Sequence, residues 1–419
     1  MPNSITEHRF PAIREYESAR DLGSVQRIWR EVGWLDGERQ EAVLKDFLNA
    51  GRTLVSDVAG AAECAVHSVP GKMRYLDRDL ELSAVTAVTT SRVARKMGLA
   101  RYLTAELIAR DALAGAEVSV LGIFEQGFYN QLGYGNGTYE QWIRFDPATL
   151  RLNSGFRVPV RLTEENWQEM HRALCQRRRG HGGCNLTPEV LMKAETIWQE
   201  KGFGLGYRDA EDGTLSHYFW AGNKGENGPI SIQVLAYRSD EELLELLALL
   251  KSLGDQVSLV EMLEPGEVQL QDLLNQPFRT RRNTRASNFE NTSRSLAYWQ
   301  LRILNLPRCI EKVTLSCQTL RFNLRLSDPV SDSLMPTTPW QGCGGDYVVT
   351  LGEVSSVSEG RDPALPVLEA DVGAFSRLWF GIRPASGLAI TDNLKAPRAL
   401  VQKLDACLRL PRVHLGWDF

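Results

Sequence analysis

The alternation of apolar and polar residues predicts a strand, a turn, a helix and a second strand in one continuous stretch. Alternate residues from Leu82 to Val88 share one face of a strand, because successive side chains of a strand point to opposite sides. Leucines between Leu99 and Ile108 recur at the spacing of a helix that lies on a sheet. Gly115 supplies a stop for this helix, and a second strand is predicted at residues 117–123. A short connection of this kind predicts a parallel, right-handed unit.

The turn that opens the helix carries Arg95, Lys96, Gly98 and Ala100. The start of a helix leaves backbone N–H groups unpaired and carries a partial positive charge, so phosphate binds there readily. Gly98 and Ala100 are small enough to let a phosphate approach, and the two cations add charge. Taken alone, however, the R-x-x-G-x-A pattern is explained equally well by an ordinary helix start with two solvated cations.

Tyr129 follows the second strand in the segment GFYNQLGYG. The two strands of a parallel unit end on the same side of the sheet, where such sheets bind ligands. We therefore expect Tyr129 to lie near the turn of residues 95–100. Alone, Tyr129 is typical of a core residue with its hydroxyl at the rim; together with the turn, it is a candidate catalytic residue.

The patterns V-x-x-x-x-x-x-R-x-x-G-x-A, from Val88 to Ala100, and F-Y-x-x-x-G-Y-G, from Phe128 to Gly135, resemble the GNAT acyltransferase fold. In length and motif order the whole chain resembles the enhanced-intracellular-survival (Eis-like) acetyltransferases. This resemblance implies an α/β (α+β) chain with two tandem GNAT-like domains and a C-terminal sterol-carrier-like domain. Ala94 and Met97 depart from the family, which often has cations there, and Phe124 stands where a small hydroxyl residue is usual.

The resemblance also implies the residues of an acetyl transfer site. Acetyl-CoA is the expected co-substrate, and no metal is expected. The expected cofactor-binding residues are Val88, Thr89, Thr90, Arg95, Lys96, Gly98, Leu99 and Ala100. Tyr129 would protonate the departing thiolate, and the terminal carboxylate of Phe419 would act as the base. The alternative for Phe419 is that the apolar chain end PRVHLGWDF packs for stability alone.

The acceptor is predicted to bind at the segment REVGWLDGERQE. Trp34 offers an aromatic wall and Asp36 a carboxylate, which together suit a cationic amine. A surface helix with a solvated acidic face explains either residue as well. By resemblance, the acceptor is a multi-amine compound or a peptide amine, and the protein is a homo-oligomer, either a hexamer or a trimer.

The order of the predicted elements divides the chain into three domains. Residues 1–150 form the catalytic GNAT domain and close with a strand at residues 138–145. Residues 151–297 repeat the element order, but their long helix begins with Ser239 as a cap and three acidic residues. Those carboxylates would repel a diphosphate, so we expect no CoA site there. Residues 298–419, which open with an apolar strand, form the sterol-carrier-like domain.

Composition narrows the function classes. The 419 residues are 43% hydrophobic and 24% charged, as in globular proteins. Two arginine runs, at residues 177–179 and 279–285, suggest nucleic acid, but the net charge of −4 argues against such a partner. The N-terminus lacks the apolar core of a signal peptide, and the apolar run Leu243–Leu250 is too short to span a bilayer. We therefore expect a cytoplasmic protein without a membrane partner.

Seven cysteines at irregular spacing argue against a disulfide framework. Cys175, His181 and Cys184 are close in sequence, but no fourth zinc ligand is in view, so we expect a flexible loop with a stray thiol. Two functions remain after this reasoning. The chain is either an N-acetyltransferase that acts on a primary amine through a ternary complex, or a non-catalytic acyl-CoA or lipid-binding protein.

Overall fold

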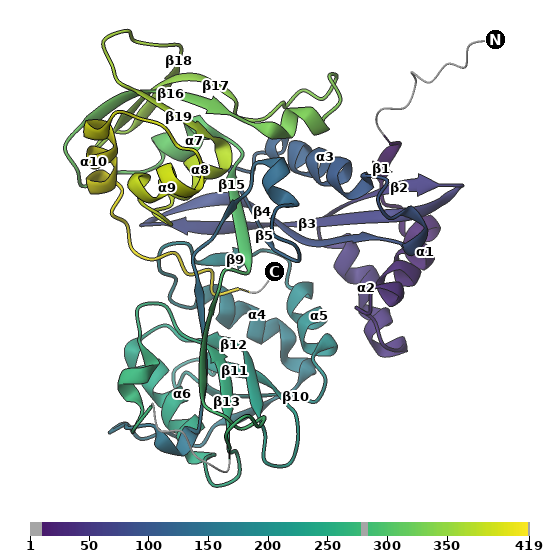
Figure 1. Ribbon diagram of the computed structural model, residues 1–419. Coiled ribbons are helices and arrows are strands. Elements are labelled where there is room, and N and C mark those ends of the chain that lie inside the picture. Colours follow the sequence, from purple (N-terminus) through teal and green to yellow (C-terminus); the bar gives the residue numbers. More distant parts are fainter. Residues whose placement is uncertain (1–10, 278–283, 418–419) are drawn as a thin grey trace. The chain divides into compact units, whose positions relative to one another are not determined.

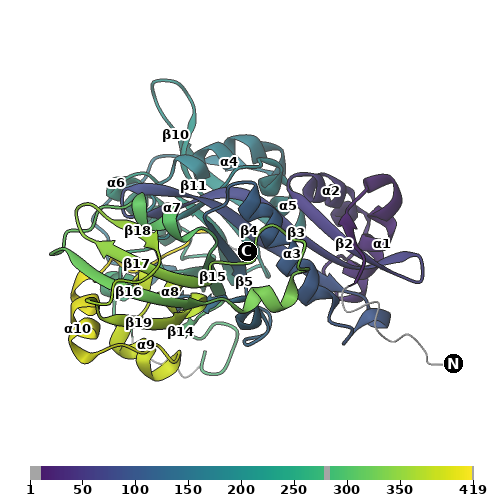
Figure 2. The same ribbon diagram turned by 90° about the horizontal axis from the view of Figure 1, so that it is seen from above.

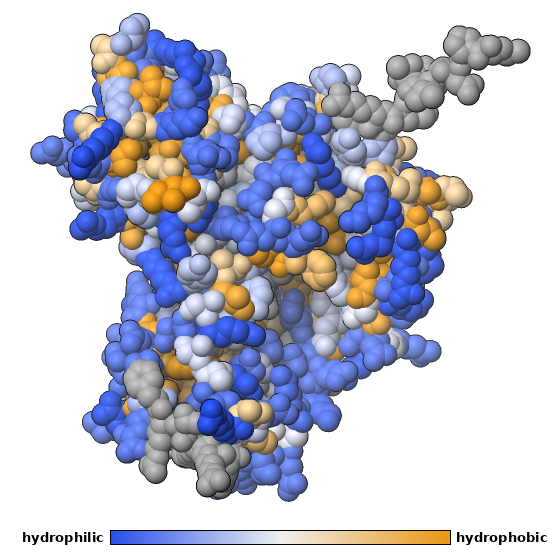
Figure 3. Space-filling model, viewed as in Figure 1, coloured by the Kyte–Doolittle hydropathy of each residue, from blue (hydrophilic) through white to orange (hydrophobic). Residues whose placement is uncertain are grey.

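The computed structural model describes residues 11–277 and 284–417. The chain folds into two compact units, each defined by the contacts among its own residues (Figure 1). Unit 1 is drawn from Met1–Thr138, His181–Pro188 and Tyr298–Phe419, and unit 2 from Tyr139–Gly180 and Glu189–Ala297. No helix in the described ranges is both long and apolar enough to cross a bilayer. On the face drawn in Figure 3, polar and charged residues predominate and apolar residues form small scattered groups.

The large sheet of unit 1 has the order β1-β2-β3-β4-β5-β15-β6, and β9 pairs with β3. Its strands are β1 (Ile13–Glu15), β2 (Arg52–Val58), β3 (Ala61–Tyr75), β4 (Arg78–Thr90), β5 (Val118–Gly122), β6 (Gly135–Asn136), β9 (Cys184–Leu186) and β15 (Trp299–Ile303). The predicted parallel pairing of β4 with β5 is confirmed. β2 and β3 form an antiparallel pair that turns at Gly60, and β3 extends to Tyr75.

Helices cover both faces of this sheet. They are α1 (Ser18–Glu31), α2 (Glu38–Asn49) and α3 (Leu99–Leu113), and α3 is the helix that the leucine spacing predicted. Val66 of β3 packs in the apolar cluster of α3, whereas its neighbour His67 contacts the ring of Phe47 on α2. Because successive residues of a strand face opposite sides, α3 lies on one face and α2 on the other.

Two strands lie in a different sheet from the one that the sequence suggested. β15, expected to open the third domain, is antiparallel to β5 and β6 within the first sheet (Figure 1). β7 (Glu140–Phe145), expected to close the first domain, pairs instead with β13 (Val260–Leu263) and β14 (Thr292–Leu296) in unit 2. The alternation that identifies a short strand carries no information about a partner far away in sequence.

The rest of unit 1 is a four-stranded sheet of order β18-β17-β16-β19 with short helices. The elements are β16 (Leu320–Ser327), β17 (Gly345–Leu351), β18 (Ser356–Glu359), β19 (Val367–Asp371), α7 (Leu306–Glu311), α8 (Val372–Trp379), α9 (Ala385–Thr391) and α10 (Arg398–Cys407). Both views show α8, α9 and α10 gathered at this sheet (Figures 1 and 2). β16 is antiparallel to β17 and parallel to β19.

A disulfide joins Cys317 to Cys407, with their Cα atoms 5.1 Å apart. The cysteine count had argued against disulfides, so this bond corrects that expectation. The two cysteines are 90 residues apart in sequence, and only folding brings them together. Spacing along the chain therefore held no signal for it.

Unit 2 contains a single sheet of order β14-β7-β13-β12-β11-β10-β8. Its remaining strands are β8 (Val160–Leu162), β10 (Gly202–Arg208), β11 (Leu215–Asn223) and β12 (Ile230–Ala236), and its helices are α4 (Trp167–Gln176), α5 (Val190–Trp198) and α6 (Asp240–Ser252). β12 and β13 are parallel and α6 connects them, as α3 connects β4 and β5 in unit 1. The predicted repetition of element order is therefore confirmed.

The segment around His181 is an ordered part of unit 1, which corrects the expected flexible loop. β9 pairs with β3, and His181 is buried. The Nδ1 atom of His181 accepts the N–H of Leu76 at 3.1 Å, so Nε2 carries the proton and donates to the carbonyl of Phe380 at 3.1 Å. Both ring nitrogens are thus used within the fold.

The end of the chain docks beside β9. The N–H of His414 donates to the carbonyl of His181 at 3.0 Å, and the N–H of Cys184 donates to the carbonyl of Leu415 at 2.8 Å. Thr138 Oγ1 donates to the carbonyl of Val413 at 2.9 Å. The side chains of Val413 and Leu415 are buried, so the anchored chain end expected from its apolar alternation is confirmed to this point. Phe419 lies outside the described residues.

Replacement of Gly182 by alanine is expected to detach the C-terminal arm, by which we mean the segment Val413–Leu415 that docks beside β9. Gly182 has a φ of 85°, and a Cβ atom there would lie 2.3 Å from Cγ1 of Val413, which is too close for two carbon atoms. Limited proteolysis should therefore cleave the last residues faster in Gly182→Ala than in the wild type. Gly180→Ala is the matched control, since the nearest atom to its Cβ is 3.8 Å away. Equal cleavage of the two variants contradicts the prediction.

Candidate functional site

The N-terminus of α3 presents free backbone donors. Gly98 is its N-cap with a φ of 78°, and no side chain caps the first turn. Within residues 11–277 and 284–417, the N–H groups of residues 96–100 have no hydrogen-bond acceptor. A Cβ at Gly98 would lie 3.5 Å from the ring of Tyr102, which is an ordinary van der Waals contact, so the turn is not tightly packed on that side. Such a helix start fits an anion.

Two cations lie in this turn. Arg95 and Lys96 are exposed, and neither forms an ion pair with the part of the chain that the structure describes. Lys96 has a φ of 65°, so the backbone bends sharply just before Gly98. Leu99, by contrast, buries its side chain in the core, which leaves only its backbone N–H for a ligand. Ala100 is partly exposed.

β4 extends beyond its parallel partner. Pairing of β4 with β5 runs from Leu82 to Val85 and then stops, whereas β4 continues to Thr90 along β3. Val88 and Thr90 are therefore partly exposed at a strand edge that β5 does not cover. Thr89 faces inward, and its Oγ1 donates to the carbonyl of Ala65 at 3.4 Å. An open strand edge of this kind can bind an extended chain by backbone hydrogen bonds.

Tyr129 begins a short 3-10 turn, η2 (Tyr129–Leu132), and is 7% exposed. It packs in the same apolar cluster as Ala94 and Leu99, which flank the open turn. Tyr129 and Leu99 thus belong to one apolar core, and the nearness of the phenol to the turn stays a prediction. Burial, with a smaller contribution from nearby Cys64, raises the pKa of Tyr129 to about 12. The phenol keeps its proton at neutral pH and can act as a donor.

The predicted acceptor residues lie on the loop between α1 and α2. Trp34 is 42% exposed and meets the ring of Trp29 edge-on, with 5.0 Å between centroids. Asp36 is exposed, and its backbone N–H donates to Gln40 Oε1 at 2.7 Å. Among the described residues, no hydrogen bond or ring contact joins Trp34 or Asp36 to Tyr129. The structure therefore leaves the acceptor role of both residues as a prediction.

Two buried polar groups near the site were missed by sequence reasoning. His67 lies opposite the β-bulge of β4 at Thr86. Because Thr53 Oγ1 donates to the carbonyl of Leu48, it accepts the Nδ1 proton of His67 at 2.8 Å. The Nε2 atom of His67 and the hydroxyl of Thr86 then have no partner in the described ranges. Burial lowers the pKa of His67 to about 3, so its ring is neutral. In the sequence, the only sign of this buried group is a single histidine, His67, within an otherwise apolar strand.

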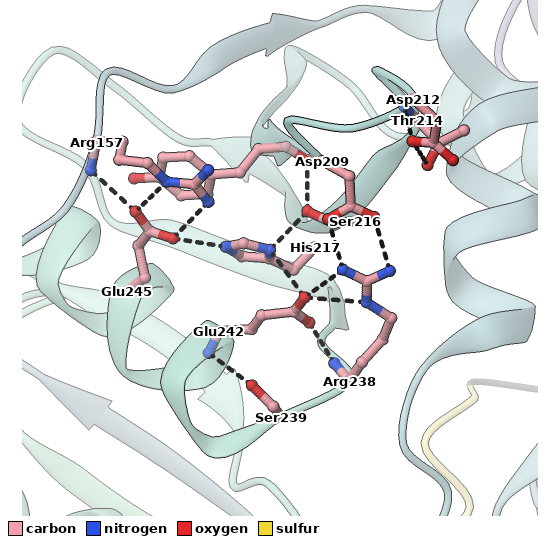
Figure 4. Close-up of polar contacts among 11 residues, drawn as sticks. Arg157, Asp209, Asp212, Thr214, Ser216, His217, Arg238, Ser239, Glu242 and Glu245 are labelled. Atoms are coloured by element: carbon pink, nitrogen blue, oxygen red, sulfur yellow. Dashed lines mark hydrogen bonds and ion pairs between the residues drawn. The ribbon is translucent and has the colours of Figure 1, made fainter.

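Helix α6 occupies in unit 2 the place that α3 has in unit 1, but its first turn is closed (Figure 4). Ser239 accepts the N–H of Glu242 at 3.3 Å, and a carboxylate oxygen of Glu242 accepts the N–H of Arg238 at 2.6 Å. The predicted acidic cap is confirmed. Its carboxylates already stabilise the positive end of the helix and would repel a second anion there.

The carboxylate of Glu245 is expected to stabilise unit 2 in a pH-dependent way. It accepts the side chain and the backbone N–H of Arg157, which lower its pKa from 4.5 to about 2 (Figure 4). A depressed pKa contributes stability above the unfolded value, and that stability is lost as pH falls toward the folded value.

Thermal unfolding should show a lower Tm for Glu245→Gln at neutral pH, and the difference from the wild type should shrink as pH falls from about 5 toward about 3. Glu226→Gln is the control, because Glu226 is exposed and has no ion pair among the described residues. A pH-independent difference for Glu245→Gln contradicts the assignment.

Comparison with known proteins agrees with this geometry. Residues 14–137 match the family model described as an acetyltransferase (GNAT) domain. No curated protein matches the chain. A probable N-acyltransferase from Enterococcus faecalis V583 has a TM-score of 0.77 at 16% identity, with 96% of this chain and 97% of that chain covered. A GCN5-related N-acetyltransferase from Anabaena variabilis ATCC 29413 has a TM-score of 0.76 at 14% identity, covering 97% and 100%.

Eis1 from Mycobacterium abscessus has a TM-score of 0.75 at 17% identity, with 97% of this chain and 100% of that chain covered. At such identities a structural likeness establishes the fold. The predicted α/β (α+β) fold class, with tandem GNAT-like parts followed by a third C-terminal sheet, is confirmed.

Proposed function

We propose, from the premise that this chain carries a GNAT acetyltransferase domain, that it transfers the acetyl group of acetyl-CoA directly to a primary amine of a cationic acceptor. The observation that carries the proposal is the uncapped start of α3, in a unit whose apolar core also buries the phenol of Tyr129. The acetyltransferase match favours this enzyme over the non-catalytic acyl-CoA or lipid-binding alternative. In this proposal the turn binds the diphosphate of CoA and the phenol donates a proton.

The turn of residues 95–100 fits the diphosphate of CoA. Its backbone N–H groups would donate to the phosphate oxygens, and Arg95 and Lys96 would neutralise their charge. The open edge of β4 at Val88, Thr89 and Thr90 would hold the extended pantetheine. When bound, acetyl-CoA supplies the activated acetyl thioester. No side chain of the protein needs to become acylated, because the amine can attack directly once both substrates are aligned.

Tyr129 would deliver its proton to the departing thiolate sulfur. Its raised pKa means that the proton is present at the start of each cycle. A base must also accept a proton from the acceptor ammonium, and the terminal carboxylate of Phe419 is our candidate. In support, the arm at Val413–Leu415 runs in the same direction as His181–Cys184, beside β9. β9 is antiparallel to β3, so this direction leads toward the part of β3 that pairs with Val88.

A thiol-release assay tests the proposal. The full-length protein is incubated with acetyl-CoA and a panel of polyamines, aminoglycosides, lysine peptides and neutral alcohols. Cationic amines should support turnover and alcohols should not. Trp34→Ala and Asp36→Asn should raise KM for the amine more than KM for acetyl-CoA, whereas Glu226→Gln, an exposed change in unit 2, should alter neither. Binding of CoA without thiol release to any cationic amine contradicts the proposal.

A further inference from the structure

The strand β15 lies between β5 and β6, and the chain segment that carries Tyr129 connects those two strands (Figure 1). Residues from the C-terminal third of the chain therefore lie beside the Tyr129 turn. None of the described residues hydrogen-bonds to the Tyr129 hydroxyl, and its ring makes only edge contacts with Phe128 and Tyr134. The direction of the phenol must then be set by the backbone of the turn and by packing.

Arg302 of β15 holds the end of the turn. Its guanidinium donates to the carbonyl of Leu132, the last residue of η2. The same guanidinium pairs with Asp328 at 2.5 Å and lies 5.2 Å from the ring centroid of Trp340. Arg302 and Asp328 are both buried, and Asp328 also accepts the backbone N–H of Cys343 at 2.8 Å. A buried charge with this many partners has little freedom to move, so Leu132 is fixed in turn.

Gln300 holds the turn at a second point. Its side-chain amide is buried and donates both to Asn130 Oδ1 at 3.2 Å and to Asn136 Oδ1 of β6. Asn130 accepts the N–H of Gly127 through the same oxygen at 3.0 Å, and its amide donates to the carbonyl of Tyr134 at 2.8 Å. Asn130 directly follows Tyr129 in the chain, so Gln300 holds the residue next to Tyr129 and Arg302 holds the end of the same turn.

The packing around Gly133 adds to this restraint. Gly133 ends the turn with a φ of 78°, and a Cβ there would lie 2.9 Å from Nη1 of Arg302 and 2.5 Å from Cγ1 of Val372. The backbone of the turn therefore lies directly against β15 and α8. A shift of the Arg302 or Val372 side chain toward Gly133 would therefore displace η2.

We propose that Arg302 and Gln300 are positioning residues for Tyr129, so that the C-terminal third of the chain takes part in acetyl transfer through this turn. This inference rests on the acid role given to Tyr129 under the proposed function. It explains why β15 carries a buried arginine and a buried glutamine, both aimed at one short turn, where apolar residues would fill a strand interior at lower cost.

A double-mutant cycle on the full-length protein tests it. Gln300→Met keeps the volume and removes the amide, and Arg302→Lys keeps the charge but loses the fork of donors. Each change should lower kcat about tenfold or more, with KM for acetyl-CoA nearly unchanged, since small misplacements of a catalytic group are costly. In a Tyr129→Phe background the same changes should lower kcat no further, because there is no proton left to position.

Lys312→Met is the matched control. Lys312 pairs with buried Glu117 at 2.7 Å in the same compact unit, so its loss should lower Tm without any coupling to Tyr129. Equal kcat losses for Gln300→Met in both backgrounds would overturn the positioning role and leave the acid role intact. If Tyr129→Phe itself leaves kcat unchanged, the acid role fails first and the inference with it. Should Arg302→Lys not fold, as far-ultraviolet circular dichroism would show, Gln300→Met alone decides.

Discussion

Replacement of Tyr129 by phenylalanine is expected to lower kcat for acetyl transfer about a hundredfold, the usual contribution of a well-placed general acid. The substitution removes one oxygen from a ring that is 7% exposed and packed against its neighbours, so the fold and the CoA turn should persist. The thiolate must then depart unprotonated or take a proton from water. KM for acetyl-CoA should stay close to its wild-type value, because the phenol would act on the leaving sulfur and not on the diphosphate.

Steady-state kinetics with one good amine acceptor measure this effect, and Tyr134→Phe provides the control. Tyr134 lies in the same apolar cluster, and its hydroxyl bonds to Ser119 at 2.7 Å. Its loss should lower Tm, since one buried hydroxyl loses its partner, but kcat should be retained. A Tyr129→Phe enzyme as active as Tyr134→Phe would remove Tyr129 from the mechanism.

Replacement of Ala100 by glutamate is expected to weaken CoA binding by at least about tenfold while leaving the protein as stable or more stable. Ala100 lies in the first turn of α3, at the position that Glu241 occupies in the first turn of α6. A carboxylate there interacts favourably with the helix dipole but competes for the free N–H groups and repels a diphosphate. This single substitution would thus give α3 an acidic first turn like that of α6.

Calorimetric titration with CoA and a thermal melt of the free protein measure the two effects together. Ala100→Gln is the matched control, because it adds the same volume without the charge. Glutamine should weaken binding much less than glutamate and should not raise Tm. Similar losses of affinity for both variants would mean that bulk and not charge is responsible, which contradicts an electrostatic site at this turn.

The helix start at Gly98 and the tyrosine after β5 could be predicted because their signals are local. A glycine that caps a helix, alternate residues in a strand and a capping serine at Ser239 each act within a few residues of their own position. The parallel order of β4 and β5 then follows from the handedness of strand–helix–strand units, and that order alone predicts that Tyr129 lies near the turn.

Other parts of the structure depend on contacts between distant residues. β15 reads as an apolar strand in either sheet, and only its pairing with β5 and β6 shows that it completes the first one. The disulfide and the buried ion pair of Arg302 with Asp328 are likewise formed by segments that meet only after folding. Asp328 carries no local signal of this kind, so sequence reasoning missed that it restrains the Tyr129 turn through Arg302.

The most direct test of the account is a crystal structure of the full-length protein with coenzyme A. The account predicts one CoA per chain, with its diphosphate on the N–H groups of residues 96–100 and its sulfur near the hydroxyl of Tyr129. A diphosphate at the first turn of α6, or a sulfur far from Tyr129, would contradict it.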